Sequence, residues 1–159
     1  MTDSETILDN AGEGSRKPPL FLVDGSNVAH GGNRIPRIRY LRAVLDSLAR
    51  YPVRIVTMVD ASLRHKIDNP EDLEDLINSG RVIQAPAGRT VDEFLMQLAI
   101  RKKSEGENVY VLTNDRFPED HARGHIARIA FLRVALEGDE VWLFSPVLES
   151  VIPGEVQVA

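Results

Sequence analysis

The stretch PLFLVDGSNV, residues 19–28, joins an apolar run to a polar turn. The apolar part, Leu20 to Val23, is short and unbroken, which is typical of a strand buried on both faces of a parallel sheet. It ends in Asp24, which Gly-Ser-Asn follows. A carboxylate is costly in a core, but parallel sheets bind ligands at the carboxyl ends of their strands. The stretch therefore predicts a buried strand, within residues 18–24, that ends in an active site.

The rest of the chain alternates apolar runs with segments of helical period. Further strands are expected at 53–60, 81–86 and 108–115, and helices at 37–51, 69–80 and 90–103. This alternation predicts an α/β fold of three layers, with a mostly parallel central sheet flanked by helices. Residues 125–146 hold two apolar runs around Glu-Gly-Asp, which indicates either a C-terminal hairpin or a helix-to-strand turn.

Composition limits the class of protein. The chain has 159 residues, 43% hydrophobic and 27% charged, as expected for one globular domain. No apolar run approaches the roughly 20 residues of a membrane span, and the absence of cysteine excludes disulfides and Cys-based zinc sites. Residues 1–17 are polar and lack the pattern of a signal peptide. We expect residues 1–17 to form a disordered arm, residues 18–159 to form a single domain, and the protein to be cytoplasmic.

The charge is unevenly distributed. The net charge of −5 argues against bulk attraction to nucleic acid. However, residues 34–66 carry eight basic residues against only Asp46 and Asp60. This basic segment is either a phosphate-binding surface or a solvated helix face, and the charge pattern leaves both open.

Carboxylates recur where strands end. Asp24, Asp60 and Asp115 each come at the end of an expected strand, and these ends share one edge of a parallel sheet. Asp92 and Glu93, in the first turn of the helix at 90–103, could reach the same edge. Two carboxylates about 5 Å apart repel by roughly 3 kcal/mol at an effective dielectric near 20, so such a cluster needs protons or a cation. Oxygen ligands without cysteine favour Mg²⁺, with Mn²⁺ as the alternative.

Each of these acids also has a structural interpretation. Aspartate is a common helix N-cap and turn residue, which is the alternative role for Asp24, Asp60 and Asp115. Thr-Val-Asp-Glu, residues 90–93, is a capping box with Thr90 as N-cap and Glu93 as its partner. The capping role is favoured for Glu93, whereas Asp92 is freer to bind a metal.

Three motifs together resemble a known family. They are VDGSNVAHGGN (23–33), TVDEFLMQLA (90–99) and VLTNDRFPED (111–120). They are similar to the PIN-like, NYN-superfamily ribonuclease domain of the Regnase (MCPIP) type, from about Leu20 to Asp120. The resemblance implies a Mg²⁺-dependent endoribonuclease on a Rossmann-like sheet.

The resemblance also implies roles for individual residues. Asp24, Asp92 and Asp115 take the metal-ligand positions, and Glu93 is the second acid of the middle pair. Asn27 and Asn114 would orient ligand waters or phosphate. The chain departs from the family in its Asp-Glu middle pair, where Asp-Asp is usual, and in lacking the CCCH zinc finger of animal members. Asp60 has no acidic counterpart in those animal proteins.

The expected reaction is hydrolysis of RNA that leaves a 5′-phosphate and a 3′-hydroxyl. The candidate substrate contacts lie near the strand ends or in the basic segment: Ser26, Asn114, Arg64, Lys66, Arg116, Arg37 and Arg39. RNA is the expected partner, a membrane is not, and a homodimer is left open. The alternative function is a PIN-like module that binds RNA or protein without cutting. A phosphatase is disfavoured, because Asp-Gly-Ser-Asn lacks the Asp-x-Asp nucleophile motif.

Overall fold

The computed structural model describes residues 17–114, 129–137, 140–144 and 157–158. Its strands are β1 (Leu20–Asp24), β2 (Arg54–Val59), β3 (Ile83–Gln84), β4 (Val109–Leu112), β5 (Ala130–Glu137), β6 (Glu140–Phe144) and β7 (Gln157–Val158). Its helices are α3 (Gly25–His30), α4 (Ile38–Leu48), α5 (Pro70–Asn78) and α6 (Val91–Ser104), with a short 3-10 helix, η1, at Leu63–His65.

The strands form one sheet in the order β3-β2-β1-β4-β5-β6-β7. β1 to β5 run parallel, with Leu22 of β1 opposite Val56 of β2 and Val111 of β4. β6 and β7 are antiparallel. The chain builds outward from β1 to β2 and β3, then crosses to the other side of β1 to form β4. The carboxyl end of β1 is therefore a topological switch point, where open α/β sheets bind ligands.

The expected α/β fold is confirmed, with differences at the ends of elements. The antiparallel pairing of β5 with β6 favours the hairpin over the helix-to-strand turn, although residues 138–139 between them lie outside the described residues. The third strand is reduced to Ile83–Gln84, and the second ends at Val59, so that Asp60 follows it directly. The sequence did not predict α3, η1 or β7, because two to six residues are too few to show a period.

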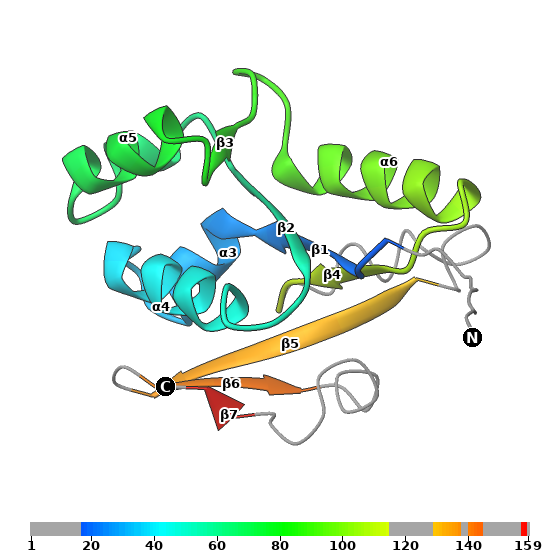
Figure 1. Cartoon of the computed structure of the whole chain (residues 1–159). Helices are drawn as coiled ribbons and strands as arrows, with labels where there is room; N and C mark the ends of the chain where they lie inside the picture. Colours follow the sequence, from blue (N-terminus) through cyan, green and yellow to red (C-terminus); the bar gives the residue numbers. More distant parts are fainter. Residues whose placement is uncertain (1–16, 115–128, 138–139, 145–156, 159) are drawn as a thin grey trace.

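Helices cover both faces of the sheet (Figure 1). On one face, Phe21 and Val23 pack with the apolar sides of α4 and α5. On the other, Leu20 and Leu22 pack against α6. Every residue of β1 is buried, and full burial of one such apolar side chain stabilises the fold by about 1.5–3 kcal/mol. The strand that ends in Asp24 is thus held rigidly at the centre of the domain.

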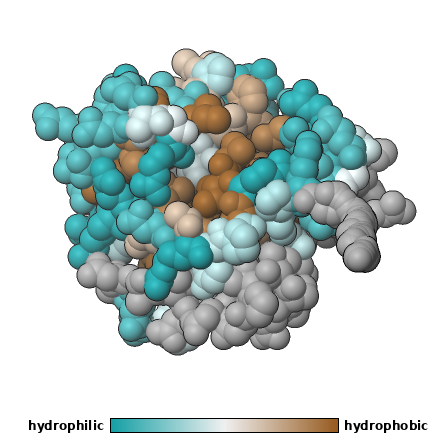
Figure 2. Space-filling model, viewed as in Figure 1, coloured by the Kyte–Doolittle hydropathy of each residue, from teal (hydrophilic) through white to brown (hydrophobic). Residues whose placement is uncertain are grey.

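The sheet is well covered where α6 packs on it and more exposed at its β2–β3 side. Figure 2 shows apolar surface at the centre of the view, between the positions of α5 and α6 in Figure 1. Val56 and Met58 of β2, which pack against the α6 cluster, are only half-buried, and Ile83 of β3 is 45% exposed. Within the described part of the chain, no helix is long and apolar enough to cross a membrane.

Candidate active site

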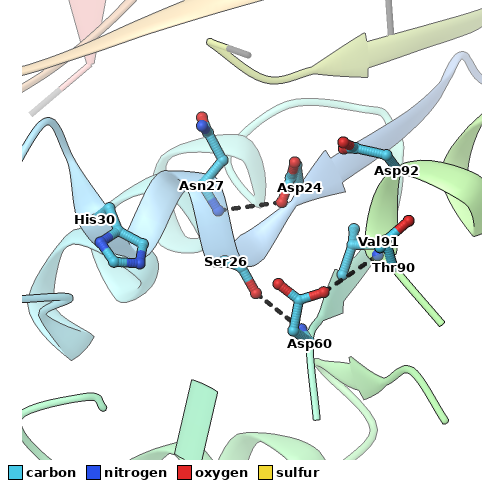
Figure 3. A pocket seen from close by; sticks show the side chains of 8 residues that line it. All are labelled: Asp24, Ser26, Asn27, His30, Asp60, Thr90, Val91 and Asp92. Atoms are coloured by element: carbon cyan, nitrogen blue, oxygen red, sulfur yellow. Dashed lines mark hydrogen bonds between the residues drawn. The ribbon is translucent and has the colours of Figure 1, made fainter. Parts of the chain in front are cut away.

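Asp24 combines a structural role with a place in the site. Its side chain is buried, and its Oδ1 accepts a hydrogen bond from the backbone N–H of Asn27 at 3.1 Å, which caps the N-terminus of α3. Its Oδ2 accepts from the Thr113 hydroxyl at 3.4 Å. From the sequence, Asp24 could be either a helix cap or a site residue. In the structure its carboxyl caps α3 and also lines the cleft (Figure 3).

Gly25 lets the chain turn tightly after Asp24. A Cβ at this position would lie 2.8 Å from Cγ1 of Val59 and 2.9 Å from the carbonyl oxygen of Met58. Real Cβ atoms essentially never approach other atoms so closely. Glycine therefore allows α3 to start against the end of β2, which brings Ser26 within reach of Asp60.

Asp60 connects three elements. Its backbone N–H donates to Oγ of Ser26 at 2.8 Å, and its Oδ1 accepts from the backbone N–H of Val91 at 3.2 Å (Figure 3). The first bond ties the end of β2 to α3, and the second ties it to the first residue of α6.

Asp92 enters the site from the first turn of α6. Thr90 begins this helix by accepting from the backbone N–H of Glu93 at 3.3 Å, as the capping motif predicts. The Asp92 side chain points toward Asp24 (Figure 3). A helix N-terminus is favourable for negative charge, so the position suits a carboxylate.

These side chains surround a cleft of about 280 Å³ at the carboxyl end of β1 and β2. Its lining residues are Asp24, Ser26, Asn27, His30, Asp60, Thr90, Val91 and Asp92. Seven of the eight come from the Asp-Gly-Ser-Asn turn, the Thr-Val-Asp segment or the end of β2, and the eighth is His30. The lining is mostly polar and includes three aspartates.

The electrostatics of the cleft show in Asp24. The pKa of its carboxyl is raised from 3.8 to about 7, mainly by burial, while the hydrogen bond from Asn27 acts in the opposite direction. The charges of Asp92 and Asp60, and a hydrogen-bonding contact with Asp92, contribute to this rise. The carboxyl groups of Asp24 and Asp92 are therefore close enough for their negative charges to repel each other, as the sequence predicts.

Glu93 is placed differently from Asp92. Its carboxylate accepts from Nε of Arg89 at 3.2 Å, and its side chain is 53% exposed. It does not line the cleft. Thr90 thus supplies the forward half of the capping box, while the Glu93 carboxylate pairs with Arg89.

Asn27 and Asn114 form a bridge between elements. Oδ1 of Asn27 accepts from the backbone N–H of Asn114 at 2.9 Å. The Asn114 amide then pairs with Val134 of β5, accepting from its N–H at 2.9 Å and donating to its carbonyl at 2.5 Å. These bonds fix the chain just before Asp115. Asp115 and Arg116 themselves lie outside the described residues.

The candidate RNA-contacting cations among the described residues do not line the cleft. Arg64 is paired with Glu74 at 3.0 Å, and the Arg39 guanidinium lies 5.3 Å from the centre of the Tyr40 ring. Arg37 and Lys66 are exposed. Among the described lining residues the one basic side chain is His30, in the last turn of α3.

The sequence matches the family described as the Zc3h12a-like ribonuclease NYN domain, over residues 20–136. The chain belongs to this family. The match extends from the start of β1 nearly to the end of β5, so it covers both sides of the cleft. The resemblance predicted from the three motifs is confirmed, and the domain is of a ribonuclease type.

The other comparisons add little to the NYN assignment. A search of curated proteins found no match. Among solved structures, Rae1 (YacP) from Bacillus subtilis, as a W164L mutant, is similar with a TM-score of 0.46 and 19% identity. The likeness covers 70% of this chain and 69% of that one. This TM-score and this identity are too low to say anything about the function of the NYN domain.

The donor set of the NYN domain suits a hard divalent cation. Asp24 and Asp92 offer carboxylate oxygens, the ligands that Mg²⁺ and Mn²⁺ prefer. Positive charge between them would offset the repulsion that raises the pKa of Asp24. Across the described stretches, no three His, Cys, Asp or Glu side chains are arranged to hold a metal ion. The described pair therefore fits as part of a ligand set for such an ion.

Proposed function

We propose that this NYN domain is a divalent-metal-dependent endoribonuclease, with Mg²⁺ as the expected ion and Mn²⁺ as the alternative. The observation that carries the proposal is the pair of carboxyl groups of Asp24 and Asp92, in contact within an acidic cleft at the switch point of the sheet. A structural role alone does not account for two acids placed so close that the charge of Asp92 raises the pKa of Asp24. Membership in a ribonuclease family supports RNA as the substrate.

In this proposal Asp24, Asp92 and Asp115 hold the metal. The ion, when bound, supplies an activated water nucleophile and offsets negative charge on the phosphate. Asp24 must release its proton before it can bind a cation, and its pKa of about 7 makes this step sensitive to neutral pH. Glu93, paired with Arg89, has no direct part in the described cleft.

The RNA backbone would be held by residues around the cleft. Arg37 and Lys66 are exposed cations of the basic segment and are proposed phosphate contacts. Arg39, Arg64 and Arg116 are proposed with them, although Arg64 must share its guanidinium with Glu74. Ser26, Asn27 and Asn114 already bond to the protein, so we propose that they act mainly by holding the cleft in shape.

The test compares carboxylate variants on a mixed-sequence RNA in Mg²⁺. Asp24→Asn and Asp92→Asn should each lower cleavage by at least about 10²-fold, as expected when an essential positioned group is lost. Asp75→Asn, which changes an exposed acid on α5, is the matched control and should cleave normally. Full cleavage by both cleft variants would refute the assignment. Tight RNA binding by a wild-type protein that never cleaves would instead favour the non-cutting module.

A further inference from the structure

We propose that Asp60 is a positioning residue, which holds the first turn of α6 so that Asp92 stays beside Asp24. The proposal rests on the proposed function of the cleft. The observation that carries it is the pair of hydrogen bonds at Asp60, which join Ser26 of α3 to Val91 of α6 through the end of β2.

The bond to Val91 has a specific effect on α6. The first N–H groups of a helix have no partner within the helix, so side chains or water must satisfy them. Thr90 satisfies the N–H of Glu93 from within the same segment. Asp60 satisfies the N–H of Val91 from a different element, 31 residues away in the chain. Of these two caps, the one from Asp60 fixes the helix start to the sheet.

Asp60 is itself fixed in place. Its backbone N–H is held by Ser26, which is 8% exposed and directly follows Gly25. Asp24, Ser26, Asp60 and Val91 therefore form a short path that runs from one carboxylate to the residue preceding the other (Figure 3). Apolar contacts of Val91 and Leu95 hold α6 on the sheet, but such contacts are non-directional. Hydrogen bonds add the directional constraint.

Two other roles make different demands on Asp60. As a metal ligand it would act through the negative charge of its carboxylate, whereas positioning needs only an oxygen that accepts from the N–H of Val91. As an ordinary helix cap it would contribute only stability, as Asn69 does at α5 by accepting from the N–H of Asp72 at 3.1 Å. Asn69 does not line the cleft, which makes Asn69→Ala the matched control.

The experiment uses the full chain with Asp60→Ala, Asp60→Asn, Ser26→Ala and Asn69→Ala. Amide hydrogen exchange of the metal-free proteins reads the first turn of α6 directly, without any need for activity. We expect Asp60→Ala to speed exchange at Val91 at least about tenfold, since the amide loses its partner. Asp60→Asn keeps an acceptor oxygen, because Asn and Asp cap helices about equally well, and should exchange nearly as the wild type does.

Kinetics and metal binding then test the consequence for Asp92. Misplacement of a reacting group by about 1 Å can cost about 10²-fold, so Asp60→Ala should lower kcat by about 10- to 100-fold with little change in KM. The rise in melting temperature on adding Mn²⁺ should shrink in parallel. Asp60→Asn should restore both, Ser26→Ala should show a weaker form of the defect, and Asn69→Ala should lower stability only.

Three results would overturn the proposal. Asp60→Asn as impaired as Asp60→Ala would show that the charge, not the acceptor, matters. An unchanged kcat in a destabilised Asp60→Ala would reduce Asp60 to a cap. Unchanged exchange at Val91 would show that the hydrogen bond to Asp60 does not protect this amide.

If Asp60→Ala does not fold, Asp60→Asn and Ser26→Ala still test the proposal. If the wild type never cleaves RNA, the proposed function fails, while exchange and the Mn²⁺ shift still test the positioning of α6.

Discussion

Asp24 shows how one side chain meets several demands at the residue scale. It ends β1, caps α3 through Asn27, and shares the cleft with Asp92. Because it is buried, its charged form is disfavoured, and its pKa rises to about 7. The backbone hydrogen bond from Asn27 keeps the shift from being larger. The residue is therefore held in place by its cap, at the position where the proposed function puts a metal ligand.

The raised pKa of Asp24 predicts how stability depends on pH. Between about pH 4 and pH 7 the folded metal-free protein binds more protons than the unfolded chain, so its free energy of unfolding should fall as the pH rises. The loss is about 1.4 kcal/mol for each unit of pKa shift, a few kcal/mol in all. Glu107, whose pKa Arg54 lowers from 4.5, acts in the opposite sense and only in more acidic solution.

Urea unfolding in EDTA from pH 5 to pH 8 checks this dependence. Asp24→Asn retains a capping oxygen but cannot ionise, so its profile should be flatter and its stability at pH 8 should exceed that of the wild type. A wild-type stability that rises from pH 5 to pH 8 would contradict the assignment of the shift to Asp24.

Metal binding should show the reverse dependence on pH. A cation must displace the Asp24 proton, so affinity should grow as the pH rises through about 7. The increase in melting temperature on adding Mg²⁺ should accordingly be larger at pH 8 than at pH 5.5, and nearly absent in Asp24→Asn. An equal shift at both pH values would indicate that Mg²⁺ binds elsewhere.

Residue type and position made part of the site predictable. Asp24 and Asp92 were identifiable because acids at a strand end and in a first helical turn converge on one edge of a parallel sheet. The hydrogen bond between Asn27 and Asn114 was not predictable, because it joins residues 87 apart in the chain and depends on the placement of β4 beside β1. Asp60 was recognisable as a strand-end acid, but its bond to Val91 required the position of α6.

At the element scale, the short helix α3 controls the shape of the cleft. Gly25→Ala would place a Cβ against Val59 and the carbonyl of Met58, which are core and backbone atoms that cannot move freely. Overpacking of this kind costs about 1–3 kcal/mol, and α3 would have to move away from β2. RNA cleavage should therefore fall together with stability.

Gly80→Ala is the control for this substitution. Gly80 has a positive φ of 83° with open space around it, and it lies beyond the end of α5. The left-handed conformation should cost about 1–2 kcal/mol without changing the cleft. Melting temperature and cleavage, measured for both variants, separate the effects. Normal cleavage by Gly25→Ala would show that the close approach of α3 to β2 is dispensable.

The basic segment around α4 gives a separate prediction for RNA binding. Arg37 and Lys66 are exposed, so each would release counterions on contacting phosphate. Arg37→Ala and Lys66→Ala should each reduce the slope of log K against log salt by about 0.7 for single-stranded RNA. Arg81→Ala is the control, because Arg81 pairs with Asp46 at 3.2 Å. Unchanged slopes would assign the segment to a solvated helix face.

Elements with many residues could be predicted from their period, and short ones could not. α4 and α6 were foreseen within a few residues, because their apolar faces repeat over several turns. α3 spans six residues that start at Gly25, and it exists because Asp24 caps it and β2 supports it. Such an element depends on tertiary contacts that the local sequence does not reveal.

At the scale of the whole molecule, the order of strands creates the site. β1 lies between β2 and β4, and the crossing of the chain from β3 to β4 leaves its carboxyl end open. Residues from three distant segments, ending in Asp24, Asp60 and Asp92, meet there. The alternation of strands and helices was sufficient to predict this convergence. The pairing of β7 with β6 was not predictable, because a two-residue strand has no pattern of its own.

The measurement that tests the central claim most directly is RNA cleavage by metal-stripped wild-type protein, with and without added Mg²⁺. The carboxylates of the cleft predict no cleavage in EDTA, recovery on adding Mg²⁺ or Mn²⁺, and products with 5′-phosphate ends. Full cleavage in chelator by the stripped protein would contradict the metal-dependent mechanism. RNA that is bound but left intact at saturating Mg²⁺ and Mn²⁺ would contradict the nuclease itself.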